Sequence, residues 1–356
     1  MDWSLLQTKL RDWYFQHQRD LPWRKTRDAY SIWLSEIILQ QTRVEQGLPY
    51  YIRFLEKYPT VSDLAKAPQD EVLRTWEGLG YYSRARNLQS AAQTIVADYN
   101  GEFPKNYTDI RSLKGVGDYT AAAIASFAQD LPYAVVDGNV NRVLSRLLAE
   151  DTPINTTKGK KRFQTLADEF LDRDDPSTHN QAIMELGALQ CTPKNPDCKL
   201  CPLQEACKAR AQNRITDFPV KERKKYDRRR YLNYWYFKYD SKTILEKRES
   251  GIWKGLYQFP LHESEKALNQ QEGESLIAEF FDLEVLQSPR PYHLPKHKLS
   301  HQSLYITVWE IFSEDGPRKT FSNSSKWVPL KELKDFALPR PLRKFLDENQ
   351  LTLPLD

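Results

Sequence analysis

Long apolar runs are missing from this chain of 356 residues. No uninterrupted stretch of about 18 apolar residues occurs, so no transmembrane helix is expected. The opening residues, MDWSLLQTKLRDW, mix acidic and basic side chains and fit neither a signal peptide nor a transit peptide. Internal repeats and long low-complexity segments are also lacking. We therefore expect a cytoplasmic protein that does not enter a membrane.

A large excess of charge of one sign is lacking too. The net charge is +4, from 52 Lys and Arg against 48 Asp and Glu. Residues 1–213 hold 27 bases and 27 acids, whereas residues 214–230 alone hold eight bases and three acids. A basic tract can bind nucleic acid, but a charged linker is equally common. Charge alone therefore does not identify a partner.

The hydrophobic pattern divides the chain in two. Its length suggests two domains of roughly 150 residues, and its 40% hydrophobic content is enough for sizeable cores. In the first 210 residues apolar side chains recur every three or four positions, which predicts many short helices. Beyond them, 231–240 and 303–312 are aromatic and β-branched and predict strands, with a helix near 272–281. The predicted division is a helical domain over 1–213, a basic linker over 214–229, and a smaller α+β domain over 230–356.

Cysteine is scarce and confined to one place. The four cysteines are spaced C-x6-C-x2-C-x5-C, which in a cytosolic chain favours metal ligation over disulfides. Burying four thiolates together is costly unless a cation neutralises them. Zinc sites with four cysteines usually pair two short knuckles, whereas iron–sulfur clusters accept wider gaps. The spacing favours iron–sulfur with zinc as the alternative, and the ligands are Cys191, Cys198, Cys201 and Cys207.

Two glycines stand just before an alanine-rich helix. The segment LKGVGDYTAAAIASFA contains Gly115 and Gly117, whose turn can bring backbone amides close to a phosphate. A tight connection between two helices explains the same pattern equally well. Shortly afterwards, VVDGNVNRV places Asp137 in a Gly-Asn turn, where its carboxylate could face the same groove. A single Asp in a turn is usually a helix cap.

An unusual carboxylate occurs in WLSEIILQQT, residues 33–42. On a helix, Glu36 falls inside the apolar stripe between Ile32 and Leu39. A partly buried carboxyl group has a raised pKa and suits a general acid. A structural hydrogen bond or a solvent-facing helix end is the alternative. Paired with Asp137, Glu36 fits a scheme in which one acid protonates a leaving group and one carboxylate stabilises an oxocarbenium-like centre.

Together, the glycine hairpin, the following aspartate and the cysteine spacing resemble the endonuclease III superfamily of DNA glycosylases. RDLPWR (19–24), SEIILQQT, GLGYYSRARNL (78–88) and MELGALQC are similar to its MutY branch, the adenine DNA glycosylases, over nearly all of 10–210. The resemblance implies a two-domain fold. An all-α helix-hairpin-helix glycosylase domain carries a [4Fe–4S] cluster loop (191–207), and an α+β MutT-like (Nudix-fold) domain follows it.

The resemblance also implies catalytic roles. Glu36 matches the acid that protonates adenine N7 and helps guide the water. Asp137 matches the carboxylate that stabilises the sugar cation or forms a transient covalent link to it, and Asn139 the residue that orients the carboxylates. Tyr119 stands where bifunctional members have a Schiff-base lysine, which implies a monofunctional glycosylase that leaves an abasic site. Lys114 lies nearby, so a weak lyase side reaction stays open.

DNA contacts follow from the same likeness. Adenine must be extruded from the duplex before it can react. Gln41 and Tyr82 resemble the residues that enter the stack, and the amides of Gly115 and Gly117 are expected to hold a phosphate. Lysines between the cysteine ligands are further candidates for phosphate contacts. The residues that resemble the wall of the adenine pocket and its supports are Arg19, Leu21, Trp23 and Arg24, with a place in the core as the alternative for Trp23.

The C-terminal part resembles the MutT-like domain that recognises 8-oxoguanine, through GIWKGLYQFP (251–260) and HKLSHQSL (297–304). The glutamate-rich R-E-x2-E-E-x-G helix of Nudix hydrolases is lacking, so we expect no pyrophosphatase activity. Ser300 and His301 match a family Phe-Ser-His triplet that touches the oxidised base, but Leu299 replaces its Phe.

The predicted function is therefore removal of adenine paired with 8-oxoguanine or guanine in double-stranded DNA. A monomer associated with the nucleoid through DNA is expected. Two alternatives remain at this stage. One is a glycosylase-lyase for oxidised pyrimidines, which Tyr119 argues against. The other is a non-enzymatic iron–sulfur protein that binds DNA and has structural carboxylates.

Overall fold

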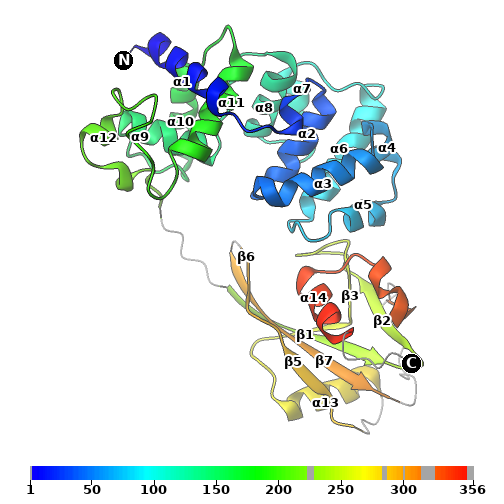
Figure 1. Cartoon of the computed structure of the whole chain (residues 1–356). Helices are drawn as coiled ribbons and strands as arrows, with labels where there is room; N and C mark the ends of the chain where they lie inside the picture. The colour runs from blue at the N-terminus through cyan, green and yellow to red at the C-terminus, as the bar shows by residue number, and fades with distance from the viewer. Residues whose placement is uncertain (1, 223–227, 283–286, 300, 314–324, 351–356) are drawn as a thin grey trace. The chain divides into compact units, whose positions relative to one another are not determined.

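Two compact units make up the computed structural model. The first combines Met1–Lys66 with Asn87–Lys224, and the second combines Ala67–Arg86 with Lys225–Asp356 (Figure 1). No helix in the described part of the chain is long and apolar enough to cross a membrane. The structure describes residues 2–222, 228–282, 287–299, 301–313 and 325–350.

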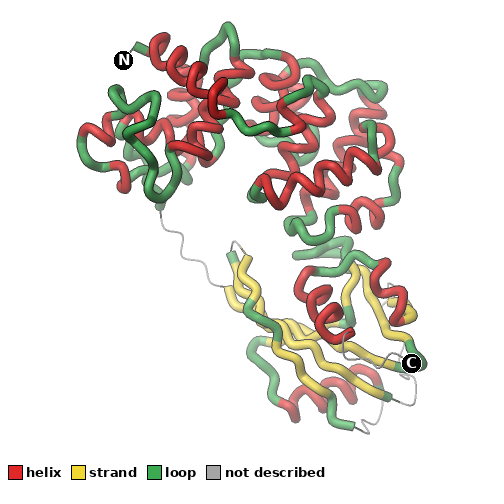
Figure 2. The backbone as a smooth tube through the Cα atoms, viewed as in Figure 1, coloured by secondary structure: helices red, strands yellow, loops and turns green. Residues whose placement is uncertain are grey.

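The first unit is built of short helices joined by loops, as the periodicity predicts (Figure 2). Its elements are α1 (Trp3–His17), η1 (Pro22–Arg24), α2 (Ala29–Leu39), α3 (Val44–Lys57), α4 (Val61–Lys66), α6 (Ser83–Asp98, which begins in the second unit), α7 (Tyr107–Ser112), α8 (Asp118–Gln129), α9 (Gly138–Leu148), α10 (Thr157–Phe170), α11 (Pro176–Glu185), η2 (Leu186–Gln190), α12 (Lys208–Ala211) and η3 (Ile215–Asp217).

Helix α2 lies at the centre of this unit and is buried along most of its length. It begins at Ala29 because the Asp28 side chain caps it, accepting a hydrogen bond from the backbone N–H of Ser31 at 2.8 Å. It packs against α8, whose small alanines permit close approach, and against α3. Helix α11 packs against α1, α8 and α9. A carboxylate on α2 is therefore surrounded by protein.

Helices α7 and α8 form the predicted helix-hairpin-helix. Gly115 adopts φ +82°, a conformation that favours glycine. A Cβ there would also lie 2.7 Å from the Cβ of Asn87. Gly117 precedes α8 and leaves its first amides without a side-chain cap.

The second unit contains two sheets. The predicted strands 231–240 and 303–312 are confirmed as β1 and β7, which pair in parallel, and the helix predicted near 272–281 is α13. The larger sheet has the order β4-β1-β7-β5 with β6 also on β7, and the smaller has the order β3-β2-β8. The elements are α5 (Gln69–Thr75), β1 (Arg228–Lys238), β2 (Lys242–Lys247), β3 (Tyr257–Gln258), β4 (Leu261–Ser264), α13 (Gln270–Phe281), β5 (Arg290–His293), β6 (His297–Leu299), β7 (Gln302–Phe312), β8 (Ser325–Pro329), η4 (Leu330–Asp335) and α14 (Arg340–Gln350).

The unit boundaries differ from the predicted ones in two respects. Arg228 and Arg229, assigned to the linker, belong to β1 because they pair with β7. Residues 67–86, assigned to the helical domain, cluster with the second unit. There, Asp70 accepts hydrogen bonds from Lys247 Nζ at 2.5 Å and from the Tyr257 hydroxyl at 3.0 Å. The periodicity of apolar residues could not indicate the unit to which residues 67–86 belong, because it predicts helices and not the elements that they pack against.

Candidate active site

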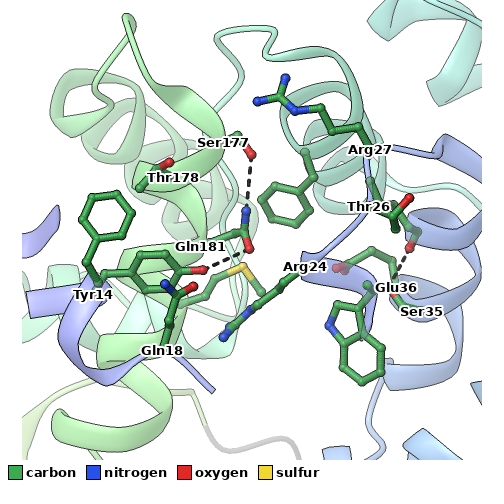
Figure 3. A pocket seen from close by; sticks show the side chains of 15 residues that line it. Tyr14, Gln18, Arg24, Thr26, Arg27, Ser35, Glu36, Ser177, Thr178 and Gln181 are labelled. Atoms are coloured by element: carbon green, nitrogen blue, oxygen red, sulfur yellow. Dashed lines mark hydrogen bonds between the residues drawn. The ribbon is translucent and has the colours of Figure 1, made fainter. Parts of the chain in front are cut away.

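Glu36 lies where two cavities of the first unit meet. It lines a small cavity of about 250 Å³ and a larger groove of about 960 Å³. The residue is only 8% exposed, as its position in the apolar stripe of α2 predicts. Figure 3 shows its side chain at the edge of the small cavity.

The surroundings of Glu36 favour its protonated form. Burial and, less strongly, the charge of Asp137 raise the pKa of Glu36 above its usual 4.5, to a net value of about 7. A hydrogen bond from Tyr119 and the charge of Arg24 act in the opposite direction. The predicted rise in this pKa is thus confirmed. A carboxyl group that titrates near neutral pH can deliver a proton and take one back.

Tyr119, on α8, makes the closest polar contact with this carboxyl. Its hydroxyl donates a hydrogen bond to Glu36 Oε2 at 2.7 Å. Burial, and then the charges of Glu36 and Asp137, hold the pKa of Tyr119 well above its usual value. The phenol therefore stays a donor near neutral pH. In the sequence, Tyr119 was notable only because it stands where bifunctional family members have a lysine. No sequence pattern predicted its hydrogen bond to Glu36.

Asp137 lines the same groove as Glu36. It is the N-cap of α9, and its Oδ1 accepts the backbone N–H groups of Asn139 at 2.8 Å and Val140 at 2.7 Å. Its Oδ2 accepts Asn139 Nδ2 at 2.7 Å, an orienting contact of the kind expected of Asn139. Burial raises the pKa of Asp137 despite these donors. The cap and the groove-facing carboxylate are the same side chain, so the two interpretations of this turn are both correct.

Arg142 connects this carboxylate turn to the cysteine segment. Its Nη2 donates to Asn139 Oδ1 at 2.8 Å and to the Gly187 carbonyl at 2.6 Å. Its Nε donates to the Cys191 carbonyl at 2.7 Å. Asn139 is thus held from both sides, which fixes the plane of the amide that it presents to Asp137.

The small cavity is enclosed by α1, η1, α2, α8 and α11. Gln181 on α11 has its amide fixed at both ends (Figure 3). The Tyr14 hydroxyl donates to Gln181 Oε1 at 3.1 Å, and Gln181 Nε2 donates to Ser177 Oγ at 3.3 Å. Neither Tyr14 nor Gln181 carried a sequence motif, and both were missed. The cavity therefore offers an oriented amide beside a carboxylic acid.

The four residues predicted for the pocket wall and its supports divide into two groups. Trp23 and Arg24 line the small cavity, and the ring of Trp23 meets that of Tyr51 edge-on. Arg19 and Leu21 lie behind it: Leu21 is buried, and Arg19 pairs with the buried Glu185 of α11.

Positive charge and exposed backbone line the larger groove. Gly115, Gly117 and Gln41 all line it, and Gln41 adopts φ +56° at the end of α2. Lys160 and Lys161 on α10 line it as well. The sequence gave no reason to select these two lysines, because exposed lysines are common on helices.

The assignment of Tyr82 to the DNA stack is wrong. Tyr82 is 4% exposed, and its hydroxyl lies 3.5 Å from the Leu338 carbonyl within the second unit. A side chain buried in this way cannot enter a base stack. The preceding Tyr81 is 49% exposed and adopts φ +48°. Of the two neighbouring tyrosines, Tyr81 is therefore the one that is accessible, and the dipeptide YY alone does not show which of them is exposed.

Comparison with known proteins identifies the family of this chain. The model of the HhH-GPD superfamily of base excision DNA repair proteins matches residues 34–169, and that of the NUDIX domain matches 233–348. The adenine DNA glycosylase of Buchnera aphidicola subsp. Baizongia pistaciae is 35% identical over 94% of this chain and 94% of its own. That of Rattus norvegicus is 32% identical over 96% of this chain and 77% of its own.

The chain belongs to the adenine DNA glycosylase family. A solved thermostable thymine-DNA glycosylase is 29% identical and superposes with a TM-score of 0.55, covering 59% of this chain and 97% of its own. The predicted helix-hairpin-helix and Nudix-like domains are confirmed. The enzyme is an adenine-specific DNA glycosylase of base excision repair.

The cysteines of the glycosylase gather around one small cavity between η2 and α12. Burial raises the pKa of Cys201 to about 12, so thiolates here need a cation. Arg146 Nη1 donates to Cys191 Sγ at 3.4 Å and supplies part of that charge. Within the described ranges, no three or more His, Cys, Asp or Glu side chains are arranged to hold one metal ion.

Of the three predicted lesion-contact residues, the structure describes Leu299, at the end of β6, and His301, just before β7. Leu299 ends β6 and packs partly buried against the core of the second unit. His301 is exposed, and Ser300 lies outside the described residues. Leu299 therefore takes part in the packing of the second unit.

Proposed function

We propose that the enzyme hydrolyses the glycosidic bond of adenine paired with 8-oxoguanine or guanine, with Glu36 as the acid and Asp137 as the carboxylate that stabilises the sugar cation. The observation that carries this proposal is the place of Glu36, buried between a base-sized cavity and a groove that Asp137 also lines. DNA is the partner of this family. The identity of the opposite base is part of the proposal.

The small cavity suits an extruded adenine. A flipped base is read by hydrogen bonds to its edge and by contact with apolar walls. The amide oxygen of a glutamine can accept a hydrogen bond from adenine N6, which leaves N7 free, and the contacts with Tyr14 and Ser177 hold Gln181 in one orientation. Glu36, protonated near neutral pH, gives its proton to N7 of the leaving base.

The chemistry then continues in the groove. Proton transfer from Glu36 makes the base a neutral leaving group, and the glycosidic bond breaks with both electrons on adenine. Asp137, fixed by three hydrogen bonds, opposes the positive charge that develops on the sugar. Water adds to C1′, and its proton goes to the Glu36 carboxylate. The products are free adenine and an abasic site.

The surroundings of Tyr119 support a monofunctional enzyme. A lyase needs an amine that attacks C1′, and Tyr119 offers a protonated phenol already committed to Glu36. We propose that Lys160 and Lys161 bind phosphates of the DNA backbone, together with the amides at Gly115 and Gly117, and take no part in a lyase reaction. The enzyme is proposed to act as a monomer.

The four cysteines fit a [4Fe–4S] cluster by donor type, number and shared cavity. When bound, the cluster supplies a covalent cross-link of the segment 191–207. Arg146 donates to the sulfur of Cys191 and to the Thr192 carbonyl, so it holds the segment and balances thiolate charge. Measuring iron, sulfide and visible absorbance of protein purified without oxygen tests this assignment.

The second unit is proposed to recognise the base opposite adenine. Its support is the NUDIX match together with the segment around Leu299 and His301. Replacing Leu299 by Phe is expected to change the ratio of adenine release opposite 8-oxoguanine to that opposite guanine. An unchanged ratio in a folded Leu299→Phe variant contradicts a role of this side chain in discrimination.

The decisive test is adenine release under single-turnover conditions. Duplexes carry adenine opposite 8-oxoguanine, guanine, cytosine or thymine, and Glu36→Gln is run alongside. We expect fast release opposite 8-oxoguanine, slower release opposite guanine, none opposite thymine, and no strand cleavage without alkali. Equal rates with all four partners would refute the proposed specificity, and release by Glu36→Gln at the native rate would refute the proposed acid.

A further inference from the structure

Glu185, at the end of α11, binds two arginines and is fully buried. Its Oε1 accepts Arg19 Nε at 2.9 Å and Arg24 Nη1 at 2.9 Å, and its Oε2 accepts Arg19 Nη2 at 2.7 Å and Arg24 Nη2 at 2.8 Å. The backbone N–H of Arg19 also donates to it at 2.8 Å. Such paired contacts fix the planes of both guanidinium groups.

Only one arginine of this clamp reaches the small cavity. Arg24 lines it, whereas neither Arg19 nor Glu185 is among the residues that do. The Arg24 guanidinium lies over the ring of Tyr14, 5.6 Å from its centre. The Tyr14 hydroxyl in turn orients the amide of Gln181. A continuous set of contacts therefore joins Glu185 to the amide that the proposed function assigns to adenine.

The clamp also sets a charge. Two guanidinium groups and one carboxylate leave a net charge of about +1 near the small cavity. The ionisable groups that face Glu36 are Tyr119 from α8, Asp137 from the start of α9 and Arg24 from η1. Any change in the balance of the clamp thus reaches Glu36 through Arg24.

We propose that Glu185 is a positioning residue of the glycosylase, which fixes Arg24 and thereby both the wall of the base pocket and the charge that faces Glu36. This inference rests on the proposed role of Glu36 as the acid. It assigns Glu185 no contact with substrate. An ion pair kept for stability alone would leave the pH dependence of the reaction unaffected.

The test compares opposite changes in the charge of the clamp. Glu185→Gln leaves two guanidinium groups uncompensated, which favours ionised Glu36. We expect the alkaline limb of the single-turnover pH–rate profile to move about one pH unit lower, and adenine release at pH values well above 7 to fall about tenfold. Arg19→Gln removes one positive charge while Glu185 stays paired with Arg24, and the limb is expected to move to higher pH. Glu185→Asp keeps the charge and should keep the native limb while the rate falls.

The control is Glu150→Gln. Glu150 pairs with Arg162, and neither residue is among those that line the two cavities, so this variant loses an ion pair of the same type without touching the clamp. It should keep the native rate and profile. If the alkaline limb of the pH–rate profile stays at its wild-type position in both Glu185→Gln and Arg19→Gln, the inference is wrong. If Glu185→Gln does not fold, the profile of Arg19→Gln alone is the test. Failure of the wild-type enzyme to release adenine would instead contradict the proposed function.

Discussion

Glu36 and Glu185 are both glutamates buried in the helical unit, and their carboxyl groups differ in every other respect. Burial raises the pKa of Glu36 to about 7. Glu185 is buried at least as deeply, yet hydrogen bonds from Arg19 and Arg24 overcome burial and lower its pKa to about 2. Burial alone therefore does not set the state of a carboxyl group. The donors that accompany it decide whether the group carries a proton or a charge.

The contrast suits two different tasks. Glu36 has one hydroxyl donor, from Tyr119, and borders two cavities, so it can exchange a proton with a bound molecule. Glu185 uses both oxygens on fixed guanidinium groups and has no proton to give near neutral pH. A reactive carboxyl group and a structural carboxylate thus lie in the same unit, joined through Arg24.

The largest expected effect is on catalysis at Glu36. Glu36→Gln keeps the size of the side chain and an oxygen that can accept the Tyr119 hydrogen bond, but it removes the transferable proton. General acid catalysis typically contributes about 10²–10⁴ in rate, so single-turnover adenine release should fall by at least that range. Binding to a duplex with an uncleavable adenine analogue should stay within a few-fold of wild type. Loss of binding in parallel with loss of release would show that Glu36 supports the fold and not the chemistry.

The same substitution at Glu185 is expected to act on stability. Breaking a buried ion pair by removing one partner costs about 3–5 kcal/mol, because the other charges stay buried. Glu185→Gln should lower the free energy of unfolding by about that amount in urea at neutral pH, whereas Glu36→Gln should not lower it. Equal losses in the two variants would remove the distinction between a reactive and a structural carboxyl group.

The pH dependence of stability should separate the two groups further. The pKa of Glu36 is about 7 in the folded state, above its ordinary value of 4.5, so folding favours the protonated form. The contribution of Glu36 to the stability of the fold therefore falls as pH rises from about 4.5 to about 7. Glu185 is the reverse case: its contribution is present above about 4.5 and is lost as pH falls towards about 2. Unfolding in urea at several pH values, with Glu36→Gln compared with wild type, checks this. The variant should gain stability relative to wild type as pH rises through that first interval.

Sequence patterns predict the environment of Glu36 but not that of Glu185. Glu36 lies in the apolar stripe of its own helix, so its burial follows from local periodicity. The cysteines and the glycine hairpin are likewise local, because their spacing carries the information. Glu185 meets Arg19 from 166 residues away, and nothing in the local pattern of α11 marks that partner. Tyr119 and Glu36 are 83 residues apart in the sequence, and their hydrogen bond was not predicted for the same reason.

Backbone conformation limits the prediction in a second way. Tyr81 and Tyr82 are neighbours with the same side chain, yet Tyr81 has a positive φ and is exposed, whereas Tyr82 is buried. Likewise, residues 67–86 belong to the second unit through contacts such as those of Asp70. Motifs therefore selected residues that the structure places around one groove, such as Glu36 and Asp137, but they did not indicate the side chains that support them.

A smaller effect is expected from the residue that orients Asp137. Asn139→Ala removes the hydrogen bond to Asp137 Oδ2 and keeps the two backbone donors to Oδ1. Hydrogen bonds to charged groups contribute about 1.5–3 kcal/mol, so adenine release should fall about 10- to 100-fold. The alkaline limb set by Glu36 should stay near its native position, because this variant changes no charge. A rate within twofold of wild type would mean that the two amides alone hold the carboxylate.

The smallest expected effect tests the hydrogen bond from Tyr119 to Glu36. The Tyr119 hydroxyl stabilises the ionised form of Glu36, so Tyr119→Phe should raise the pKa of Glu36 above about 7 and extend adenine release to higher pH. Each pH unit of displacement corresponds to a tenfold change in the protonated fraction above the pKa, so a rise of severalfold in rate is expected there, with little change at lower pH. The measurement is the single-turnover profile of Tyr119→Phe beside that of Tyr107→Phe, a nearby tyrosine without this contact. Displacement to lower pH would mean that the phenol serves the protonated acid, and Glu36 would then resemble Glu185 in depending on its donors to stay in its working state.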